Sequence, residues 1–374
     1  MSSHAPAKSS ATASFEIVPR DPKAGRALSR ANAYALAMAY VKGLIDVEGD
    51  LIEAVRYHLA TASEDWRSKL VDAVCRWMPW RLIQGRPGRA AAARNIRFHY
   101  DRSNDFYRLF LDSQLVYSCA YFRREDDTLD QAQSGKLDHI CRKLHLEQND
   151  RFLDIGCGWG ALVLQASRSF GAIATGCTLS TRQFQYAAER IRAEGVRNAS
   201  VREVDYRDVD GEFDKIASVG MFEHVGLAQL ATYFRKVYAL LAPKGLFLNH
   251  GITRPASVRA NSQSMFIARK VFPGSQIVQL ADVVQTAEQV GFEVLDVENL
   301  YKHYARTTRI WVDRLTANRE ACLKTAPEET WRTWRLYLAG CSLAFEEGDM
   351  GLHQVLLAKR GAGAAPSTRE YMYK

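Results

Sequence analysis

The sequence contains no run of 18 or more apolar residues, so no segment is a candidate for a membrane-spanning helix. Its 7 cysteines include no CxxC pair and no pairing with histidine at a zinc-binding spacing, which argues against a disulfide framework and a metal site. Residues 1–14 are rich in serine and alanine and lack the apolar core of a secretory signal. We therefore expect a cytoplasmic protein with reduced thiols and a disordered lead at residues 1–14.

The chain has a net charge of +8, and one stretch of it carries only basic charges. No acidic residue lies between Asp72 and Asp101. The basic residues of this stretch, with tryptophans among the first of them, are Arg76, Arg81, Arg86, Arg89, Arg94 and Arg97. Guanidinium groups bind lipid phosphates, and indole rings lie at the headgroup level of a bilayer. The stretch therefore predicts contact with an anionic membrane surface. A solvated helix face that buries the tryptophans explains it equally well, and the stretch alone does not exclude RNA.

The N-terminal part of the chain has the apolar spacing of helices. This spacing covers residues 28–60 with a break at Gly43, and a further helix is predicted over residues 65–77. Glycine and proline at positions 85–88 then interrupt the pattern. We interpret residues 15–95 as a small helical accessory domain.

From Asp150 onward, short apolar strands alternate with helices. The predicted strands are 151–155, 172–178, 201–204, 215–219, 245–249, 292–297 and 355–359. The predicted helices are 161–169, 182–193, 228–241, 282–290, 306–323 and 328–346, and residues 361–374 are expected to form a frayed tail. This alternation predicts an α/β fold, a doubly wound parallel sheet with helices on both faces, within a domain at residues 96–360.

A glycine-rich turn follows the first of these strands. Gly156, Gly158 and Gly160 open the next helix with the spacing GxGxG, whereas a dinucleotide site has GxGxxG. Glycines let the backbone approach a ligand, and the start of the helix offers free N–H groups. The second strand lacks the acidic residue that binds a ribose of NAD about 20 positions further on. The pattern favours a nucleotide-like cofactor other than NAD at the carboxyl edge of the sheet.

These segments resemble the class I methyltransferases, which use S-adenosylmethionine (SAM). More specifically, they resemble the cyclopropane-fatty-acyl-phospholipid synthases and the mycolic acid cyclopropane synthases. The matching segments, which keep the family's order between about Asn95 and Lys359, are Leu153–Gly160, His99–Asp101, Tyr117–Phe122, Thr178–Ser180, Asp205–Asp208 and Ser218–Gly226. Several motifs in register make the resemblance specific. It implies a Rossmann-like methyltransferase domain and, more loosely, a lipid-binding role for the N-terminal domain.

Carried over by position, the resemblance implies a SAM site built from several loops. Tyr117 and Ser118 would close over the methionine end of the cofactor. The turn on which it rests would comprise Asp154, Gly156, Gly158, Trp159 and Gly160. The residues at the ribose and adenine side would be Thr178, Leu179, Gln183, Tyr206 and Arg207.

The resemblance also implies a reaction, namely methylene transfer from SAM to the cis double bond of an unsaturated fatty acyl chain of a membrane phospholipid. Water would capture the carbocation that forms, so the pocket should be dry and lined by aromatic faces. Candidates for these faces are Tyr100, Phe106, Tyr107, Tyr121, Phe122 and Phe266. Ring closure then needs a base, and the resemblance implies a bound bicarbonate ion. The groups that would hold it are Cys119, Glu223, His250, Tyr304 and the backbone of Ile252.

Cys341 is a further candidate, because a cysteine at this position in the family has been linked with activity. The chemistry needs no covalent enzyme intermediate, however, and a cysteine on an apolar late helix is typically structural. His224 is adjacent to Glu223, but the resemblance assigns the role to Glu223 and His250.

Two positions depart from the family pattern and bear on the product. Ser103 stands where the family commonly has glycine, and Gly251 stands where it commonly has threonine. Relatives with the same motifs deliver a plain methyl group or a hydroxylated chain, so an acyl methyltransferase without ring closure is the alternative.

A catalytically silent module that binds membrane or RNA is a third hypothesis, but such a module would have no use for the predicted base site. As partners we expect unsaturated phospholipid acyl chains at the inner membrane surface and no nucleic acid. The resemblance also makes a homodimer possible.

Overall fold

The structure is a computed structural model that describes residues 14–22, 24, 33–62, 103–258, 276–363 and 365–373. Several predictions fall outside these residues and are therefore not addressed by it. They concern the lead at residues 1–13, the helix at 65–77, the arginine-rich stretch, and the aromatic candidates Tyr100 and Phe266.

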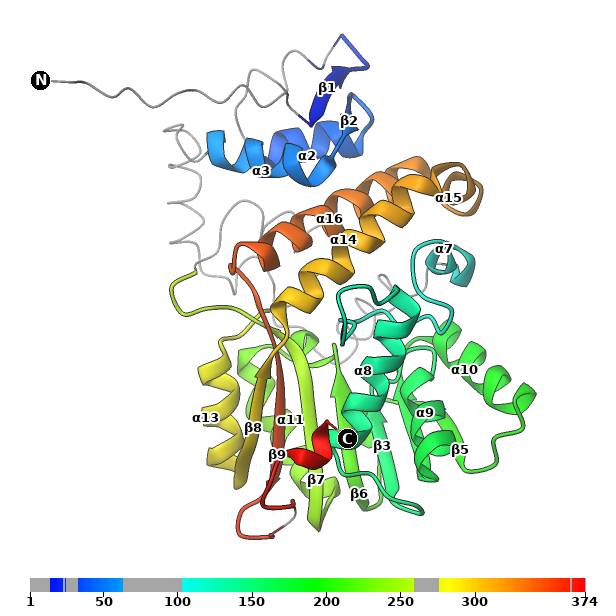
Figure 1. Cartoon of the computed structure of the whole chain (residues 1–374), viewed down its shortest axis with the longest axis vertical. Coiled ribbons are helices and arrows are strands. Elements are labelled where there is room, and N and C mark those ends of the chain that lie inside the picture. The colour runs from blue at the N-terminus through cyan, green and yellow to red at the C-terminus, as the bar shows by residue number, and fades with distance from the viewer. Residues whose placement is uncertain are drawn as a thin grey trace, which may run out of the picture.

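A 7-stranded sheet with the order β5-β4-β3-β6-β7-β9-β8 forms the centre of the chain (Figure 1). Its strands are β3 (Arg151–Ile155), β4 (Ile173–Thr178), β5 (Ala199–Glu203), β6 (Phe213–Val219), β7 (Leu241–Thr253), β8 (Phe292–Asn299) and β9 (Gly351–Lys359). Strands β3 to β7 pair in parallel. Strand β9 lies between β7 and β8 and is antiparallel to both. The predicted α/β sheet is confirmed, with its last strand inserted in the opposite direction.

Helices cover both faces of this sheet, as predicted. The elements are α7 (Asn104–Arg108), α8 (Leu129–Lys143), α9 (Ala161–Phe170), α10 (Thr181–Ala193), α11 (Leu230–Leu240), α13 (Leu280–Val290), α14 (Tyr301–Ala317), α15 (Arg319–Thr325) and α16 (Glu328–Glu346). Phe152 packs in a cluster with residues of α8 and α9, whereas its neighbour Leu153 packs with residues of α11 and α13. Successive side chains of a strand point to opposite faces, which produces these two layers.

The N-terminal segment contains a two-stranded sheet that the helical prediction missed. Strands β1 (Phe15–Pro19) and β2 (Ile45–Gly49) pair in antiparallel fashion, with α2 (Ala33–Val41) between them and α3 (Leu51–Ala62) after them. Each strand has five residues, which is too short for alternation to stand out against the helical spacing around it.

The same segment packs on α16, so it is joined to the rest of the chain by a shared core (Figure 1). The buried guanidinium of Arg332 donates to the carbonyl oxygens of Tyr40 and Ile45 at 3.3 Å and pairs with Asp46 at 3.1 Å. Arg335 donates to the hydroxyl of Tyr40 at 2.9 Å. These bonds join the end of α2 and the start of β2 directly to α16.

The prediction of a frayed tail was wrong. A 3₁₀ turn, η4 (Glu370–Met372), packs against α8, and the side chain of Met372 is buried. The carbonyl oxygen of Met372 lies 3.3 Å from Nδ1 of His139, and the ring of Tyr371 contacts that of His145. The buried side chain of Met372 and the ring contact of Tyr371 hold this turn against the domain.

Candidate active site

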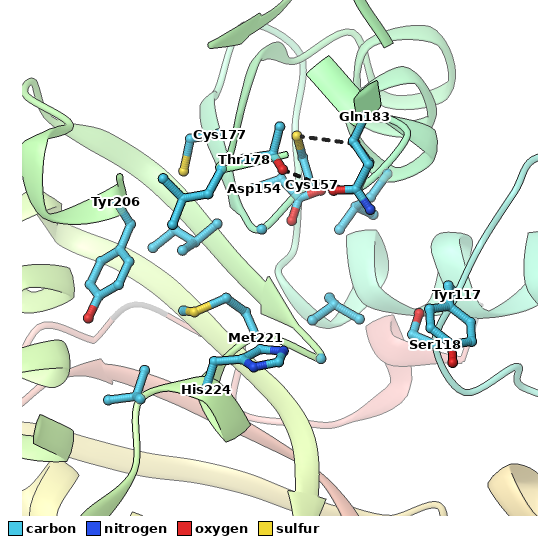
Figure 2. Close-up of a pocket in the computed structure, with 18 of the residues that line it drawn as sticks. Tyr117, Ser118, Asp154, Cys157, Cys177, Thr178, Gln183, Tyr206, Met221 and His224 are labelled. Atoms are coloured by element: carbon cyan, nitrogen blue, oxygen red, sulfur yellow. Dashed lines mark hydrogen bonds between the residues drawn. The ribbon is translucent and has the colours of Figure 1, made fainter. Parts of the chain in front are cut away.

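A cavity of about 700 Å³ opens at the carboxyl ends of β3, β4, β5 and β6 (Figure 2). Loops after these strands line it, together with residues 115–118 and one side of α8. All of the predicted cofactor residues except Gly160 lie in its lining: Tyr117, Ser118, Asp154, Gly156, Gly158, Trp159, Thr178, Leu179, Gln183, Tyr206 and Arg207. Parallel strands end at the same edge of a sheet, which is why residues up to 90 positions apart meet here.

The turn after β3 requires glycine at two places for different reasons. Gly156 has a φ of +82°, and a Cβ there would lie 3.0 Å from the side chain of Met221. Gly160 has a φ of +84°, and a Cβ there would lie 3.0 Å from the Cβ of Ala187 on α10. Gly160 therefore serves the packing of α9 against α10, which explains its position behind the cavity wall.

Substituting Gly156 by alanine is expected to lower the affinity for S-adenosylhomocysteine about 10-fold, because the left-handed strain of about 1–2 kcal/mol and the contact of the new Cβ with Met221 would shift the turn that lines the cavity. Isothermal titration calorimetry measures this. Gly195→Ala is the matched control, since Gly195 has a φ of +66° and open space around it, away from the cavity. We expect Gly195→Ala to lose stability but no affinity. Equal affinity losses in both variants would contradict a specific role for the turn.

One end of the cavity carries the residues predicted for ribose and adenine. The hydroxyl of Thr178 donates to Oε1 of Gln183 at 2.9 Å (Figure 2). It also accepts from the backbone N–H of Ser180 at 3.2 Å. Asp205 holds the guanidinium of Arg207, whose Nε lies 2.8 Å from Oδ1. Figure 2 shows Tyr206 across the cavity from Tyr117 and Ser118, so the site is suited to an extended ligand with two chemically different ends.

The opposite end is held by polar side chains of α8 that the sequence analysis did not single out. Nε2 of Gln133 donates to the carbonyl oxygens of Ser118 and Val116 at 2.8 and 3.3 Å. Nζ of Lys136 donates to Oγ of Ser118 at 2.9 Å. Gln133 and Lys136 are buried although their residue types are mostly exposed in proteins. Their spacing of three on a helix was the available signal, since it places both on one face.

Two oppositely charged groups in the cavity wall have perturbed pKa values. Burial raises the pKa of Asp154 to about 7, although the charge of Lys136 opposes this. Burial lowers the pKa of Lys136 to about 8, against the charges of Asp112 and Asp154. Within the described ranges, Oδ1 of Asp154 has no hydrogen-bond partner.

The residues predicted to hold the base lie beside the cavity lining and are linked to one another by backbone contacts. Oε1 of Glu223 accepts from the backbone N–H of Ile252 at 2.7 Å. That N–H is thus already used by Glu223, whereas the resemblance assigned it to the anion. His250 lies two residues before Ile252 on β7, and successive even positions share one face of a strand.

Cys119 and Tyr304 reach the same region through Leu300. Sγ of Cys119 lies 3.8 Å from the carbonyl oxygen of Leu300, which also accepts from the backbone N–H of Tyr304 at 3.1 Å. The N–H of Leu300 donates to the carbonyl oxygen of Leu352, which is the partner of Ile252 in the sheet. The tertiary structure therefore gathers these predicted residues where β7 and β9 meet α14.

Glu223 and His250 each present a buried polar atom without a partner in the described part of the chain. These atoms are Oε2 of Glu223 and Nε2 of His250. The amide nitrogen of Gln354 lies 3.1 Å from Nδ1 of His250, so Nδ1 accepts and the neutral ring carries its hydrogen on Nε2. Burial lowers the pKa of His250 to about 3 and raises the pKa of Glu223 to about 7. Nε2–H of His250 can donate to a small oxyanion, and Oε2 of Glu223 can do so when the carboxyl group is protonated.

The cysteines of the candidate set are not activated as nucleophiles. Burial raises the pKa of Cys119 far above neutrality and that of Cys341 to about 12. Both remain thiols at neutral pH, and only a thiolate is a strong nucleophile. Cys341 is buried beside Tyr337 on α16, which favours a packing role.

His224 is the histidine that lines the cavity itself (Figure 2). Burial lowers its pKa to about 4, so it is neutral at physiological pH. It therefore adds no charge to the cavity.

Aromatic rings connect the cavity to the predicted base site. The ring of Tyr117 lies 5.5 Å from that of Tyr107 and 5.2 Å from that of Trp311. Trp311 contacts Tyr304, whose ring lies 4.7 Å from that of Phe345. Phe106 and Tyr107, two of the aromatic candidates, are fully buried in this group.

The other two described aromatic candidates lie elsewhere. The rings of Tyr121 and Phe122 stack on that of His303, at centroid distances of 4.9 and 6.2 Å. They pack outside the aromatic connection between the cavity and Tyr304.

The two departures from the family pattern have local structural explanations. The hydroxyl of Ser103 accepts from the backbone N–H of Phe106 at 3.2 Å and so caps α7. A Cβ at Gly251 would lie 2.0 Å from a ring carbon of Phe222 and 3.0 Å from Oε1 of Glu223. The ring of Phe222 therefore fills the space that a side chain at position 251 would take.

Residues 88–355 match the sequence profile of the family described as mycolic acid cyclopropane synthetase. The chain belongs to this family. A probable fatty acid methyltransferase from Pseudomonas putida is 41% identical over 370 residues, covering 96% of this chain and 91% of that protein. Cyclopropane mycolic acid synthase 3 from Mycobacterium tuberculosis is 35% identical and covers 71% of this chain and 96% of its own.

Solved structures agree with this assignment. The cyclopropane synthase MmaA2 from Mycobacterium tuberculosis matches with a TM-score of 0.70 at 33% identity, over 71% of this chain and 98% of that chain. The mycolic acid cyclopropane synthase CmaA1, complexed with SAH and CTAB, matches with a TM-score of 0.69 over the same shares. This chain is a SAM-dependent methyltransferase of the cyclopropane synthase type.

No helix among the described residues is long and apolar enough to cross a bilayer. The described residues also include no group of three or more potential ligands placed to hold a metal ion. The cysteines that are described are buried and free.

Proposed function

We propose that this enzyme transfers a methylene from SAM to the cis double bond of an unsaturated fatty acyl chain of a membrane phospholipid and closes a cyclopropane ring. The observation that carries the proposal is the pair of unmatched buried atoms on Glu223 and His250. A plain methyltransferase cavity has no need of them, whereas ring closure requires a proton to be removed in a dry site. Contact with a membrane surface remains an expectation from the arginine-rich stretch. A homodimer and the absence of nucleic acid remain expectations from the resemblance to the family.

The residues of the cavity would support the first step, transfer of the methyl group to the double bond, by orienting the methyl donor. SAM supplies an electrophilic methyl group on its sulfonium, and an alkene is a weak nucleophile, so the two must be held in line. The ring of Tyr117 and the wall at Trp159 restrict the end of the cavity that faces the aromatic connection. Tyr107, Tyr117, Trp311 and Tyr304 form one packed aromatic group, whose rings would exclude water and stabilise positive charge on an acyl chain bound beside it.

Glu223 and His250 would support the second step. Bicarbonate, when bound, supplies the base for the proton of the newly added methyl group. Nε2–H of the neutral His250 would donate a hydrogen bond to this anion, and Glu223, with its pKa of about 7, would exchange a hydrogen bond with it through Oε2. The backbone N–H of Ile252 binds the other oxygen of Glu223, Oε1, and so fixes the orientation of the carboxyl group.

Methylation without ring closure is the second candidate function. It is favoured by the ring of Phe222, which fills the space at Gly251 next to Glu223 and so restricts the base site. The relative from Pseudomonas putida carries the name fatty acid methyltransferase, which agrees with this alternative.

Expression in a host rich in monounsaturated phospholipids, followed by mass spectrometry of fatty acid methyl esters, distinguishes the two. Ring formation adds one CH2 and removes the double bond. Retained unsaturation, a saturated methyl branch or added oxygen indicates the alternative. No change in any lipid, from a protein that binds SAM, would mean that the acceptor is of another class.

A further inference from the structure

Lys136 is a buried ammonium group whose role the reaction leaves open. Its side chain lies on α8, is only 2% exposed and lines the cavity. Its nitrogen donates to Oγ of Ser118 at 2.9 Å. Among the described residues, no carboxylate oxygen lies within the 4 Å of an ion pair with this nitrogen. Asp112 and Asp154 act on its charge only from further away.

Another lysine on the same helix shows what a structural buried ammonium looks like in this fold. Lys143, seven residues later, is completely buried, and its nitrogen lies 2.9 Å from Asp296 and 2.6 Å from Glu298. Two carboxylates thus compensate its charge, as a buried ion requires. Lys136 has one neutral hydroxyl in their place, and Asp112 and Asp154 act on it only from beyond ion-pair distance, so a ligand anion in the cavity would complete its compensation.

The position of Lys136 in the cavity indicates which part of a ligand would supply the compensating negative charge. Ser118 and Tyr117 lie at the end of the cavity opposite Tyr206 (Figure 2), and Lys136 is bonded to Ser118. Oδ1 of Asp154, which is also buried and unmatched, lies in the same lining. A cation without an ion-pair partner and an acidic oxygen without a hydrogen-bond partner together suit a zwitterion, and the methionine end of SAM carries an ammonium and a carboxylate.

We propose that Lys136 binds the carboxylate of the methionine part of SAM and thereby sets the position of the sulfonium in the cavity. This inference rests on SAM as the methyl donor and does not depend on the identity of the lipid proposed above. A charge-assisted hydrogen bond in a buried site is strong and short, so the interaction orients the cofactor as well as retaining it.

Calorimetric titration with S-adenosylhomocysteine and with its decarboxylated analogue tests the proposal without any turnover. The wild-type protein is expected to bind the carboxylated ligand about 10- to 100-fold more tightly. Lys136→Met keeps the length of the side chain and is expected to remove this preference by weakening S-adenosylhomocysteine alone. Lys136→Arg should retain most of the preference, because it keeps the charge. Lys136→Gln serves as a second neutral variant if the methionine variant folds poorly.

Lys215→Met is the matched control. Lys215 is also buried, with its pKa lowered mainly by burial, but it lies on β6 outside the cavity lining. Its replacement should leave both affinities unchanged. Equal binding of the two ligands by the wild-type protein would overturn the proposal, as would an equal loss for both ligands in Lys136→Met. A lipid other than the one proposed above would leave these titrations unaffected.

Discussion

Glu223→Gln is expected to lower turnover about 100- to 10,000-fold while the affinity for S-adenosylhomocysteine stays within about 2-fold. Glutamine has the same shape and can still accept the N–H of Ile252 through its carbonyl oxygen. It cannot ionise, however, whereas burial places the pKa of Glu223 at about 7, where both protonation states are accessible. Glu223 also lies outside the lining of the cofactor cavity, which is why binding should persist.

Initial rates of methyl transfer to lipid vesicles, combined with calorimetry, measure the two effects separately. Glu288→Gln is the control, because Glu288 is an exposed residue on α13 and its charge lies away from the site. Full activity in Glu223→Gln would remove the assignment of the base site. A loss of cofactor binding in parallel with activity would instead show that Glu223 shapes the cavity.

Lys143→Met is expected to lower the free energy of unfolding by about 3–5 kcal/mol, since it leaves two carboxylates without their shared cation. Lys143 lies on α8, whereas Asp296 and Glu298 lie on β8. The two ion pairs therefore join a helix to the edge strand of the sheet. Urea denaturation followed by circular dichroism measures the change. A loss below about 1 kcal/mol would mean that water reaches the group and screens it.

The pH dependence of the free energy of unfolding provides an independent measure of the ion pair between Lys143 and Glu298. Burial disfavours the ionised form of Glu298, but hydrogen bonds and charge from His139 and Lys143 outweigh this and lower its pKa to about 2. The unfolded chain has the ordinary value of 4.5. The stabilisation is therefore fully present above about pH 4.5 and is lost as the pH falls toward 2. In Lys143→Met the acid-dependent loss should be smaller, whereas an identical slope in both proteins would assign the effect to other carboxylates.

The elements with the clearest apolar patterns were predicted well. The bounds of β3 and α16 agree with the predicted residues, because a buried parallel strand and a long helix leave unambiguous patterns. The helix predicted at 306–323 is divided between α14 and α15, and β7 begins at Leu241, before Pro243. Proline is tolerated near the start of a strand, where its missing N–H interrupts little of the ladder.

The sequence by itself determined the chemistry of the cofactor turn. GxGxG after a strand, without an acidic residue at the end of the next strand, argued against NAD. Motifs in register then identified the methyltransferase family. These are properties of residues close together in the chain, where the backbone requirement for glycine acts locally.

Only the tertiary structure decided what surrounds that turn. The contacts between Glu223 and Ile252, between Phe222 and Gly251, and between Lys136 and Ser118 join residues 18 to 29 positions apart. A lysine on a helix is ordinarily a solvent-exposed residue, and its sequence neighbours do not reveal which face of the helix is covered. Packing of α8 over the end of β3 places Lys136 in the cavity, because burial depends on which elements meet and not on the residue alone.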